Sequence, residues 1–398
     1  MKILFVFTDM LRPNLLKSYN SKIKNKGPLD DFIENFGGTL FKNCYTPAPD
    51  TPRSLGCLHS GLYPNKNGCD TRIRWPYFFY KEKNSLLESL VDKGFDVTFY
   101  ATENKTNVGP LPEGAKKKIN ILNCLSKFDK AISEDLKNDE DSAYFLTLDD
   151  YHWANDDYGH NSLGDYYGQL HLKNYLESFF MNNNQDMFDH IFWFSDHGHK
   201  LYSELKNNDQ HSLLNDDRTQ IHLLVRKKNE MQLSYDNKLR GIIDIYPTIL
   251  SIINSSVDHE LDGLDLYSKE GHDFIVFEDH SDFSVSLSQV INNWAVRTRN
   301  ELYIESLDSN ILFDVLGSGD YQNKPKIDNP SYYSNMIRKH SISYDVTKKQ
   351  NSVLNFYQEL RNENEDLEFS DNNRRIFKNR NIVFKIIRYL LKDLKKRW

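Results

Sequence analysis

The sequence predicts an α/β protein with a mostly parallel central sheet that is covered by helices on both faces. Apolar segments with the length of strands alternate along the chain with segments that have helical spacing. Segments such as HIFWFS at 190–195 carry apolar residues at consecutive positions, which is typical of strands buried on both faces. Hydrophobic residues make up 39% of the chain and charged residues 27%, as in globular proteins.

The apolar runs predict the individual strands, and the segments with helical spacing predict the helices. The predicted strands cover residues 2–8, 39–45, 95–101, 143–149, 190–195 and 221–226. The predicted helices cover residues 29–36, 53–60, 84–93, 125–137, 166–181 and 238–253. In a parallel sheet of this kind, ligands bind at the carboxyl ends of the strands.

The length of 398 residues predicts a large domain with smaller additions, because single hydrophobic cores rarely grow to this size. The core is expected to span residues 1–270, followed by a small subdomain with an antiparallel sheet at 271–325. A polar linker at 326–372 and a basic amphipathic helix at 373–398 complete the chain.

The composition and the lengths of the apolar runs limit which partners and which cellular location can be expected for this protein. The formal net charge of −7 argues against a nucleic-acid partner. The first apolar run, Ile3 to Phe7, is too short for a signal peptide and is soon followed by Asp9. No run reaches the roughly 18 to 20 apolar residues that span a bilayer. A cytoplasmic location is therefore expected.

The four cysteines have no CxxC spacing and are expected to be reduced thiols. Cys44 and Cys69 flank the segment around Thr51, where packing is a more common role for a thiol than metal binding.

Acidic and histidine side chains follow three of the predicted strands. Asp9 follows the first strand, Asp149 and Asp150 end a later one, and Asp196 and His197 follow HIFWFS. Each alone has a structural explanation, since an Asp after a strand often caps the next helix. Together they would converge on one edge of the sheet with the oxygen and imidazole ligands that a divalent cation requires.

Several motifs in order resemble the sulfatase branch of the alkaline phosphatase superfamily. FVFTDMLRPN resembles the opening strand with its metal-ligand turn, and FSDHGH resembles the late metal pair. TPRSLGCLHSGLYPNKNG at 51–68 resembles the segment that carries the nucleophile. GIIDIYPTILSIIN, LDGLDL and NWAVRTRNELYI resemble later family segments, so the resemblance extends to about residue 315.

The nucleophile position of this family is occupied here by Thr51. Sulfatases carry a Cys or Ser ten residues before the glycine that is Gly61 here, and oxidise it to formylglycine. The extra methyl group of threonine excludes this oxidation to an aldehyde. Nucleotide pyrophosphatases and phosphonate hydrolases of the superfamily have a plain Thr at this position. The resemblance therefore implies phosphoryl rather than sulfuryl chemistry. The family pattern is broken after Thr51, with Arg53 in place of Pro and Leu55 in place of Arg.

The resemblance implies a cation site formed by Asp9, Asp196 and His197, with Thr51 as both ligand and nucleophile. Metal binding would lower the pKa of the threonine hydroxyl. Arg53 is expected to pair with a nonbridging substrate oxygen. The helix N-terminus would also favour an anionic substrate. A purely structural role of Thr51, as N-cap before a proline, is compatible with catalysis.

Two alternatives are open for the second half of the site. Asp156 and His160 have the spacing of ligands to a second metal in two-metal members. His152 instead matches the substrate-contacting histidine of sulfatase-type members. His211 lies where sulfatases hold a Lys that touches the scissile group, which implies an acid or leaving-group contact. The cofactor is thus one or two divalent ions of Zn, Mn, Mg or Ca.

Three further histidines receive no catalytic role. His280 is a second candidate for a missing ligand, but a surface loop position is expected, and His199 and His222 are expected to be structural.

The C-terminal residues 374–398 combine apolar and basic residues at helical spacing. A helix docked on its own domain or on a second subunit is one interpretation. A helix that binds an anionic inner membrane surface is the other, and basic residues there contribute about 1 kcal/mol each.

The sequence as a whole predicts a metal-dependent hydrolase or transferase of phosphoryl esters, with a small-molecule or glycan-linked phosphoester as substrate. The alternatives are transfer of a phosphorylated group to or from a cell-surface glycan precursor, a binding module that has lost catalysis, and a sulfuric ester hydrolase, which Thr51 disfavours.

Overall fold

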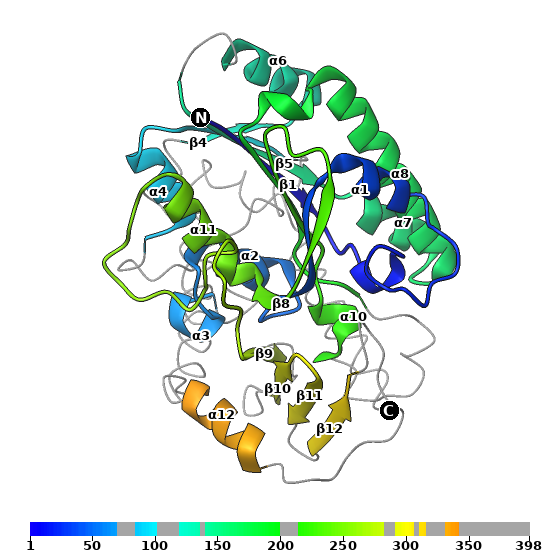
Figure 1. Cartoon of the computed structure of the whole chain (residues 1–398), viewed down its shortest axis with the longest axis vertical. Helices are drawn as coiled ribbons and strands as arrows, with labels where there is room; N and C mark the ends of the chain where they lie inside the picture. The colour runs from blue at the N-terminus through cyan, green and yellow to red at the C-terminus, as the bar shows by residue number, and fades with distance from the viewer. Residues whose placement is uncertain are drawn as a thin grey trace, which may run out of the picture. The chain divides into compact units, whose positions relative to one another are not determined.

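The computed structural model centres on an eight-stranded sheet with the strand order β4-β3-β5-β1-β6-β7-β2-β8 (Figure 1). The structure describes residues 1–69, 84–101, 119–135, 140–199, 214–281, 291–305, 310–315 and 331–341. Met1–Asp279 and Asn293–Ser343 form one compact unit. Of a second unit, His280–Asn292 and Tyr344–Trp398, the described residues are only those at the ends of two strands.

The large sheet is parallel except at one strand, which confirms the predicted fold class. β7 runs antiparallel to both of its neighbours, β6 and β2. The other pairings are parallel. The strands are β1 (Lys2–Thr8), β2 (Gly38–Tyr45), β3 (Asp96–Tyr100), β4 (Ile119–Leu122), β5 (Ser142–Leu148), β6 (His190–Ser195), β7 (Leu223–Lys227) and β8 (Leu233–Gly241).

The register of β1 with its two neighbours determines where the polar residues after the strands lie. Thr8, the last residue of β1, pairs with Leu148 of β5 and with Ser195 of β6. The three strands therefore end level at one edge of the sheet. The residues that follow them are Asp9, Asp149 and Asp196.

Successive side chains of β1 point to opposite faces of the sheet, so the strand contributes to two hydrophobic layers. Leu4 and Val6 belong to a buried cluster that includes side chains of α1, α6 and α8. On the other face Phe5 stacks on Phe145 and Phe192, with ring centroids 4.3 and 5.5 Å apart. Both faces are thus apolar, and this explains the uninterrupted apolar runs in the sequence.

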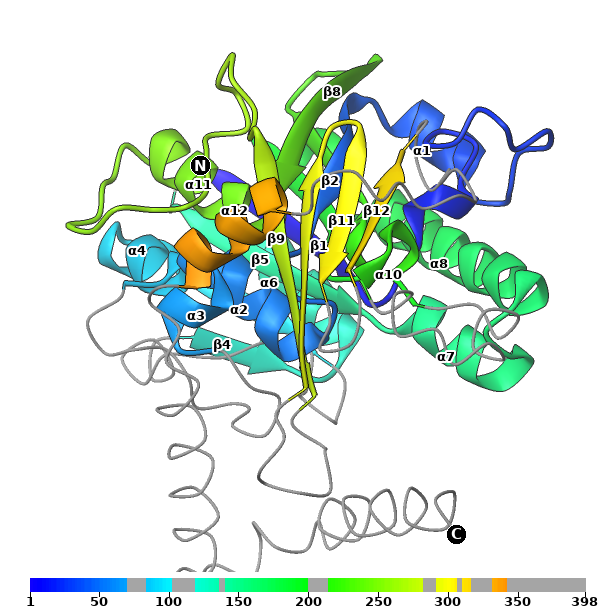
Figure 2. The same cartoon turned by 90° about the horizontal axis from the view of Figure 1, so that it is seen from below.

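Helices cover both faces of the large sheet. In Figures 1 and 2, α1, α7 and α8 lie on one side of the central strands, and α2, α4 and α11 lie on the other. The α-helices are α1 (Asp30–Phe36), α2 (Thr51–Ser60), α3 (Pro64–Asn67), α4 (Leu86–Asp92), α6 (Leu125–Asp135), α7 (Asp150–Tyr158), α8 (Ser162–Asn182), α10 (Asp216–Thr219), α11 (Ile245–Ile252) and α12 (Ser331–Ser341). Short 3₁₀ helices are η1 (Pro13–Leu15), η3 (Gln185–Met187) and η5 (Ile242–Asp244).

A small sheet follows, as predicted, and it has the order β12-β11-β10-β9. The β10–β11 and β11–β12 pairings are antiparallel. Its strands are β9 (Phe274–Ser281), β10 (Ile291–Thr298), β11 (Glu301–Glu305) and β12 (Asn310–Asp314). α12 contacts this sheet, because Tyr303 stacks on Tyr333 and its hydroxyl lies 2.8 Å from Ser334 Oγ.

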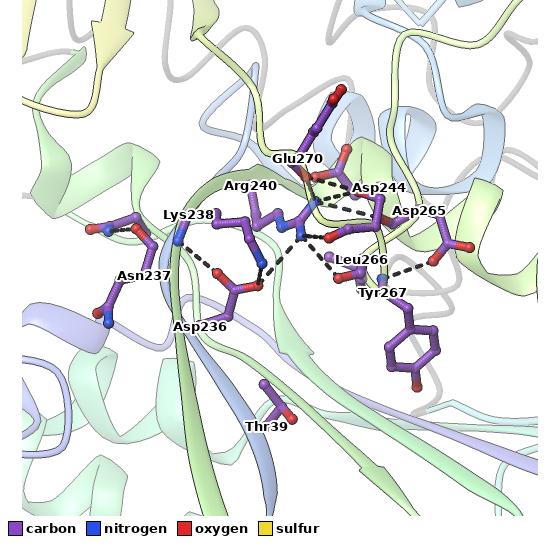
Figure 3. Close-up of polar contacts among 12 residues, drawn as sticks. Thr39, Asp236, Asn237, Lys238, Arg240, Asp244, Asp265, Leu266, Tyr267 and Glu270 are labelled. Atoms are coloured by element: carbon purple, nitrogen blue, oxygen red, sulfur yellow. Dashed lines mark hydrogen bonds and ion pairs between the residues drawn. The ribbon is translucent and has the colours of Figure 1, made fainter.

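The end of β8 organises the loop that leads into the small sheet (Figure 3). Buried Arg240 donates to the carbonyls of Leu266, Ser268 and Glu270 at 2.8 to 3.0 Å. Asp244 accepts from Leu264 N at 2.8 Å and from His272 Nε2 at 2.7 Å. These bonds satisfy backbone groups of an irregular segment, which fixes its path.

Three of the sequence predictions differ from the structure: one helix was placed wrongly, and one strand and one helix were missed. The predicted helix 238–253 begins as the end of β8, and only Ile245–Ile252 is α-helical. β8 was missed because its polar sequence LSYDNKLRG lacks a long apolar run, as suits an edge strand. α7 was also missed, since four of its nine residues are Asp or Asn, which have low helix propensity.

The predicted linker residues other than 331–341 and the whole C-terminal helix 373–398 lie outside the described residues, so their assigned roles remain predictions. Within the described part, no helix is both long enough and apolar enough to cross a membrane. None of the four cysteines forms a disulfide.

Buried His222 provides a stability prediction. Its side chain is fully buried against Trp193, with Tyr19 Oη 3.0 Å from Nδ1. Burial lowers the pKa of His222 to about 3, so the folded state holds it neutral. The unfolded chain binds a proton near pH 6.5, and folding stability should therefore be lost as pH falls below that value.

We expect this histidine to contribute about 1.4 kcal/mol of lost stability per pH unit between pH 6 and 4. In His222→Gln, the free energy of unfolding measured in urea should fall less steeply with decreasing pH. The difference in slope should correspond to about one bound proton. His171→Gln, which replaces an exposed histidine, is the control. An unchanged slope in His222→Gln would contradict the assignment.

Candidate active site

Three ligand-type side chains meet at the carboxyl edge of the sheet. Asp9, Asp196 and His197 each place one ligand atom within 4.8 Å of the others. They meet because β1 and β6 are adjacent and end level. The expected proximity of Asp9, Asp196 and His197 is therefore present, but within the described residues Asp149 and Asp150 do not belong to this group.

The turn after β1 is shaped to hold Asp196. Met10 has a φ of 65°, in the left-handed region that non-glycine residues rarely adopt. This conformation directs Met10 N to Asp196 Oδ1 at 3.1 Å, and His197 N donates to the same oxygen at 2.8 Å. Asp196 is fully buried, so its orientation is fixed by these two donors.

The remaining carboxylate oxygens fit a cation. Within the described residues, Asp9 Oδ1 and Asp196 Oδ2 are buried and accept no hydrogen bond. Burial raises the pKa of Asp196, and the nearby charge of Asp9 adds to this effect. A buried carboxylate oxygen without a hydrogen bond is costly, and a divalent ion would compensate both of these oxygens.

The tautomer of His197 leaves one ring nitrogen available to the cluster. Its Nδ1 lies 2.7 Å from the carbonyl oxygen of Gly198, which can only accept a hydrogen bond. Nδ1 therefore carries the proton in the neutral ring, and Nε2 has a free lone pair. This nitrogen lies 3.2 Å from Asp196 Oδ2.

The glycine of the DHG motif has a steric role. A Cβ at Gly198 would lie 2.0 Å from the carbonyl oxygen of Asp217. Gly198 N also donates to Arg218 O at 2.9 Å. The close approach fixes the loop after β6 against the start of α10, and no other residue type would fit there.

Thr51 faces this cluster from the first turn of α2. Its Oγ1 lies 3.3 Å from His197 Nε2. The predicted N-cap role of Thr51 was wrong, because Asp50 is the N-cap and its Oδ1 accepts from Arg53 N at 3.2 Å. The Thr51 hydroxyl is therefore not used in capping and is directed at the cluster.

His152, Asp156 and His160 form a chain that leads away from the cluster. His152 Nδ1 lies 3.0 Å from Asp9 Oδ2, and this contact raises the pKa of His152 to about 9. Asp156 approaches His152 Nε2 at 3.6 Å and His160 Nε2 at 3.4 Å. His160 stacks on His199 with ring centroids 4.0 Å apart.

The two alternatives for these residues thus occupy neighbouring positions. His152 adjoins the metal-type cluster, whereas Asp156 and His160 are not part of it within the described residues. Both the substrate contact of His152 and the second metal at Asp156 and His160 stay predictions.

Arg53 is held inside the protein by carboxylates. Its side chain is fully buried and contacts Asp50 and Asp279. Sequence reasoning missed both partners. The position of Asp50 before Thr51 and Pro52 is an N-cap signal that could have identified it, but nothing in the sequence links Asp279 to this helix.

Arg12 supports the loop after β6, and sequence reasoning missed it as well. Its Nη1 donates to the carbonyl of His199 at 2.9 Å, and Nη2 pairs with Asp165. Tyr151 donates to the same carboxylate. This buried arrangement ties the loop after β6 to α7 and α8.

The other predicted residues lie elsewhere. His211 lies outside the described residues, so its role is untested. His280 belongs to strand β9, which corrects the expected loop position. His222 lies in the core. A cavity of about 890 Å³ lies near Tyr63, beyond the carboxyl end of α2, and no predicted site residue lines it.

Comparisons with known proteins support the fold. No family model and no curated protein matches the chain. Among solved structures, a 2-O GAG sulfatase is 14% identical, with a TM-score of 0.63, over 90% of this chain and 93% of that chain. A protein in the alkaline phosphatase superfamily from Vibrio parahaemolyticus is 15% identical, with a TM-score of 0.63, over 88% of each chain.

A phosphonate monoester hydrolase from Silicibacter pomeroyi is 12% identical, with a TM-score of 0.57, over 85% of this chain and 94% of that chain. The protein therefore has the fold shared by sulfatases and other alkaline phosphatase superfamily proteins.

The cluster predicts metal-dependent stability. If Asp9, Asp196 and His197 bind a divalent ion, saturation at 100 times Kd should add about 2.7 kcal/mol to the free energy of unfolding. EDTA should remove this gain, and Asp196→Asn should abolish it together with the bound metal. Metal content by mass spectrometry and thermal unfolding with and without chelator are the measurements.

Asp156→Asn serves as a matched variant of a neighbouring carboxylate. Loss of one of two bound ions in this variant would place a second metal at Asp156, and an unchanged count would exclude it. Wild-type metal content in Asp196→Asn would contradict the site.

Proposed function

We propose that the protein is a metal-dependent hydrolase or transferase of phosphoryl esters with Thr51 as the nucleophile. The observation that supports this most directly is the position of Thr51 Oγ1, 3.3 Å from His197 Nε2 in a cluster with two buried carboxylates. A hydroxyl in this place can attack a substrate that the same cluster orients.

The side chain of Thr51 also favours phosphoryl over sulfuryl transfer. Oxidation of its carbon to an aldehyde would require loss of the methyl group. Thr51 therefore acts as an alcohol, and an alcohol can form a phosphoester with the transferred group. Sulfatases and phosphonate hydrolases share the fold, so the nucleophile rather than the fold decides between these chemistries.

The proposed reaction has two balanced steps. Thr51 Oγ1 forms a bond to phosphorus while the bond from phosphorus to the leaving oxygen breaks, and the hydroxyl proton ends on the leaving alcohol. Water, or an acceptor hydroxyl in the transferase case, then forms a bond to phosphorus while the bond from phosphorus to Thr51 Oγ1 breaks, and the proton of the attacking hydroxyl returns to Oγ1. A divalent cation bound by Asp9, Asp196 and His197 would lower the pKa of the nucleophile and offset phosphoryl charge.

The start of α2 provides an electrostatic field that favours an anionic substrate and N–H groups that can orient it. α2 is a ten-residue helix that begins at Thr51, and its first N–H groups have no partner within the helix. The helix dipole adds partial positive charge at the same end. His152, whose Nδ1 is fixed by Asp9, remains the proposed substrate contact beside the cluster.

The substrate is proposed as a small-molecule or glycan-linked phosphoester. Action on a cell-surface glycan precursor at a membrane surface would depend on residues 374–398, and it remains the second form of this proposal.

Assays with p-nitrophenyl phosphate, bis-p-nitrophenyl phosphate and p-nitrophenyl sulfate test the proposal. Metal-loaded protein should hydrolyse a phosphate ester, and Thr51→Ala should lower kcat by about 10³-fold or more, because the covalent step is lost. Thr51→Ser retains the hydroxyl and should keep part of the activity. Acid quenching should trap phosphothreonine at Thr51.

Thr39→Ala in β2 is the matched control, because it removes a threonine hydroxyl at the opposite end of the sheet strands. Sulfate turnover, or full activity in Thr51→Ala, would refute the mechanism. Absence of turnover on all three esters by metal-loaded protein would exclude simple hydrolysis and favour transfer from a specific donor.

A further inference from the structure

Four charged side chains from separate parts of the chain surround the segment that carries Thr51. Asp50 and Arg53 come from the start of α2, Arg218 from α10 and Asp279 from β9. Arg53 Nε donates to Asp50 Oδ2 at 2.5 Å, and Arg53 Nη2 donates to Asp279 Oδ1 at 3.1 Å. Arg218 Nη1 donates to the other oxygen of Asp279 at 3.1 Å.

These four residues, here called the charged clamp, are balanced in charge and mostly buried. Arg53 has no exposed side-chain surface, and Asp50 has 4%. The side chains of Asp279 and Arg218 are each 17% exposed. The two arginines lower the pKa of Asp279 against the opposing effect of burial. Ion pairs with so little solvent around them lose much more when one partner is removed than exposed pairs do.

Residues of the charged clamp make hydrogen bonds to the chain on both sides of Thr51. Before it, Arg218 Nη2 donates to the carbonyl of Pro49 at 3.1 Å. After it, the N–H of Arg53 is capped by Asp50. β9 adds a backbone contact, since Glu278 N donates to Pro47 O at 2.8 Å. The position of Thr51 Oγ1 relative to His197 therefore depends on contacts made by β9 and α10.

We infer that Asp279 and Arg218 are positioning residues, which hold Asp50 and Arg53 so that the Thr51 hydroxyl faces His197. This inference rests on the proposed function for its catalytic consequence. It also changes the role expected for Arg53. With its guanidinium held by Asp50 and Asp279, Arg53 orders the start of α2 instead of pairing with a substrate oxygen.

The clamp gives Arg53 a structural role in the segment after Thr51. Here Leu55 is buried, while Arg53 reaches a carboxylate that lies 226 residues further along the chain. Strand β9 of the small sheet thus helps to hold the first turn of α2 in place.

Asp279→Asn tests this inference, because it removes the charge and nearly preserves the shape. We expect kcat for the phosphate ester to fall 10- to 100-fold, with KM changed less than 2-fold and metal content unchanged. Amide hydrogen exchange in residues 50–54 should accelerate at least 10-fold. Arg218→Gln, at a partly exposed member, should reproduce the pattern more weakly if Asp279→Asn fails to fold.

Asp279→Glu should recover part of kcat, because the carboxylate is retained. Lys66→Gln is the matched control, since it breaks the Lys66–Asp262 ion pair beyond the other end of α2. It should alter neither kcat nor exchange in residues 50–54.

The outcomes separate this inference from the proposed function. Wild-type kcat and wild-type exchange in Asp279→Asn and Arg218→Gln would overturn the positioning role. Loss of metal in Asp279→Asn would also overturn it, because the effect would then pass through the cation site. If wild-type protein cleaves no phosphate ester, the proposed function fails, and hydrogen exchange still decides whether the clamp orders α2.

Discussion

The parallel register of β1 with β5 and β6 is the constraint on which the site depends. Because these strands end level, Asp9 and Asp196 leave the sheet side by side. The apolar layers on both faces fix this register, since a shift of one residue would turn Leu4 and Val6 away from their cluster and Phe5 away from its stacked neighbours. The polar cluster is therefore a consequence of hydrophobic packing. That packing also offsets the cost of burying two carboxylates, of which Asp9 Oδ1 and Asp196 Oδ2 accept no hydrogen bond within the described residues.

The proposed nucleophile, Thr51, comes from another part of the sheet. Thr51 lies on α2, which follows β2 near the far edge of the strand order, so its approach to His197 is not determined by the β1 register. Asp50 caps the helix, and the charged clamp holds both sides of the loop. The site thus combines a rigid half, formed by strand ends, with a half that is held by ion pairs over long separations in sequence.

This division also explains what the sequence could predict. The proximity of Asp9, Asp196 and His197 could be predicted because strands with uninterrupted apolar residues are easy to recognise and their ends meet by geometry. Thr51 became a candidate through its place in an ordered set of motifs, and its role stays a prediction. The partners of Arg53 and Arg12 were not, because Asp279 and Asp165 lie 226 and 153 residues away and no local pattern marks such pairs. β8 and α7 were missed for a related reason: a polar edge strand and a helix rich in Asp and Asn obtain their stability from neighbours rather than from their own pattern.

The fold alone leaves the chemistry open, and the residues narrow it. Structures of similar fold include a GAG sulfatase and phosphonate monoester hydrolases. A divalent cation at the strand ends, as proposed, would suit either reaction, because both transferred groups are tetrahedral and anionic. The distinction lies at one carbon atom, since a threonine keeps its hydroxyl and cannot provide the aldehyde hydrate that sulfatases use. A simple alcohol must instead be aimed by its surroundings, and the capping carboxylate of Asp50 together with buried Arg53 does this from within the protein. If Thr51 is the nucleophile, as proposed, buried Arg53 would assist the reaction by orienting the segment that carries this alcohol rather than by contacting the substrate.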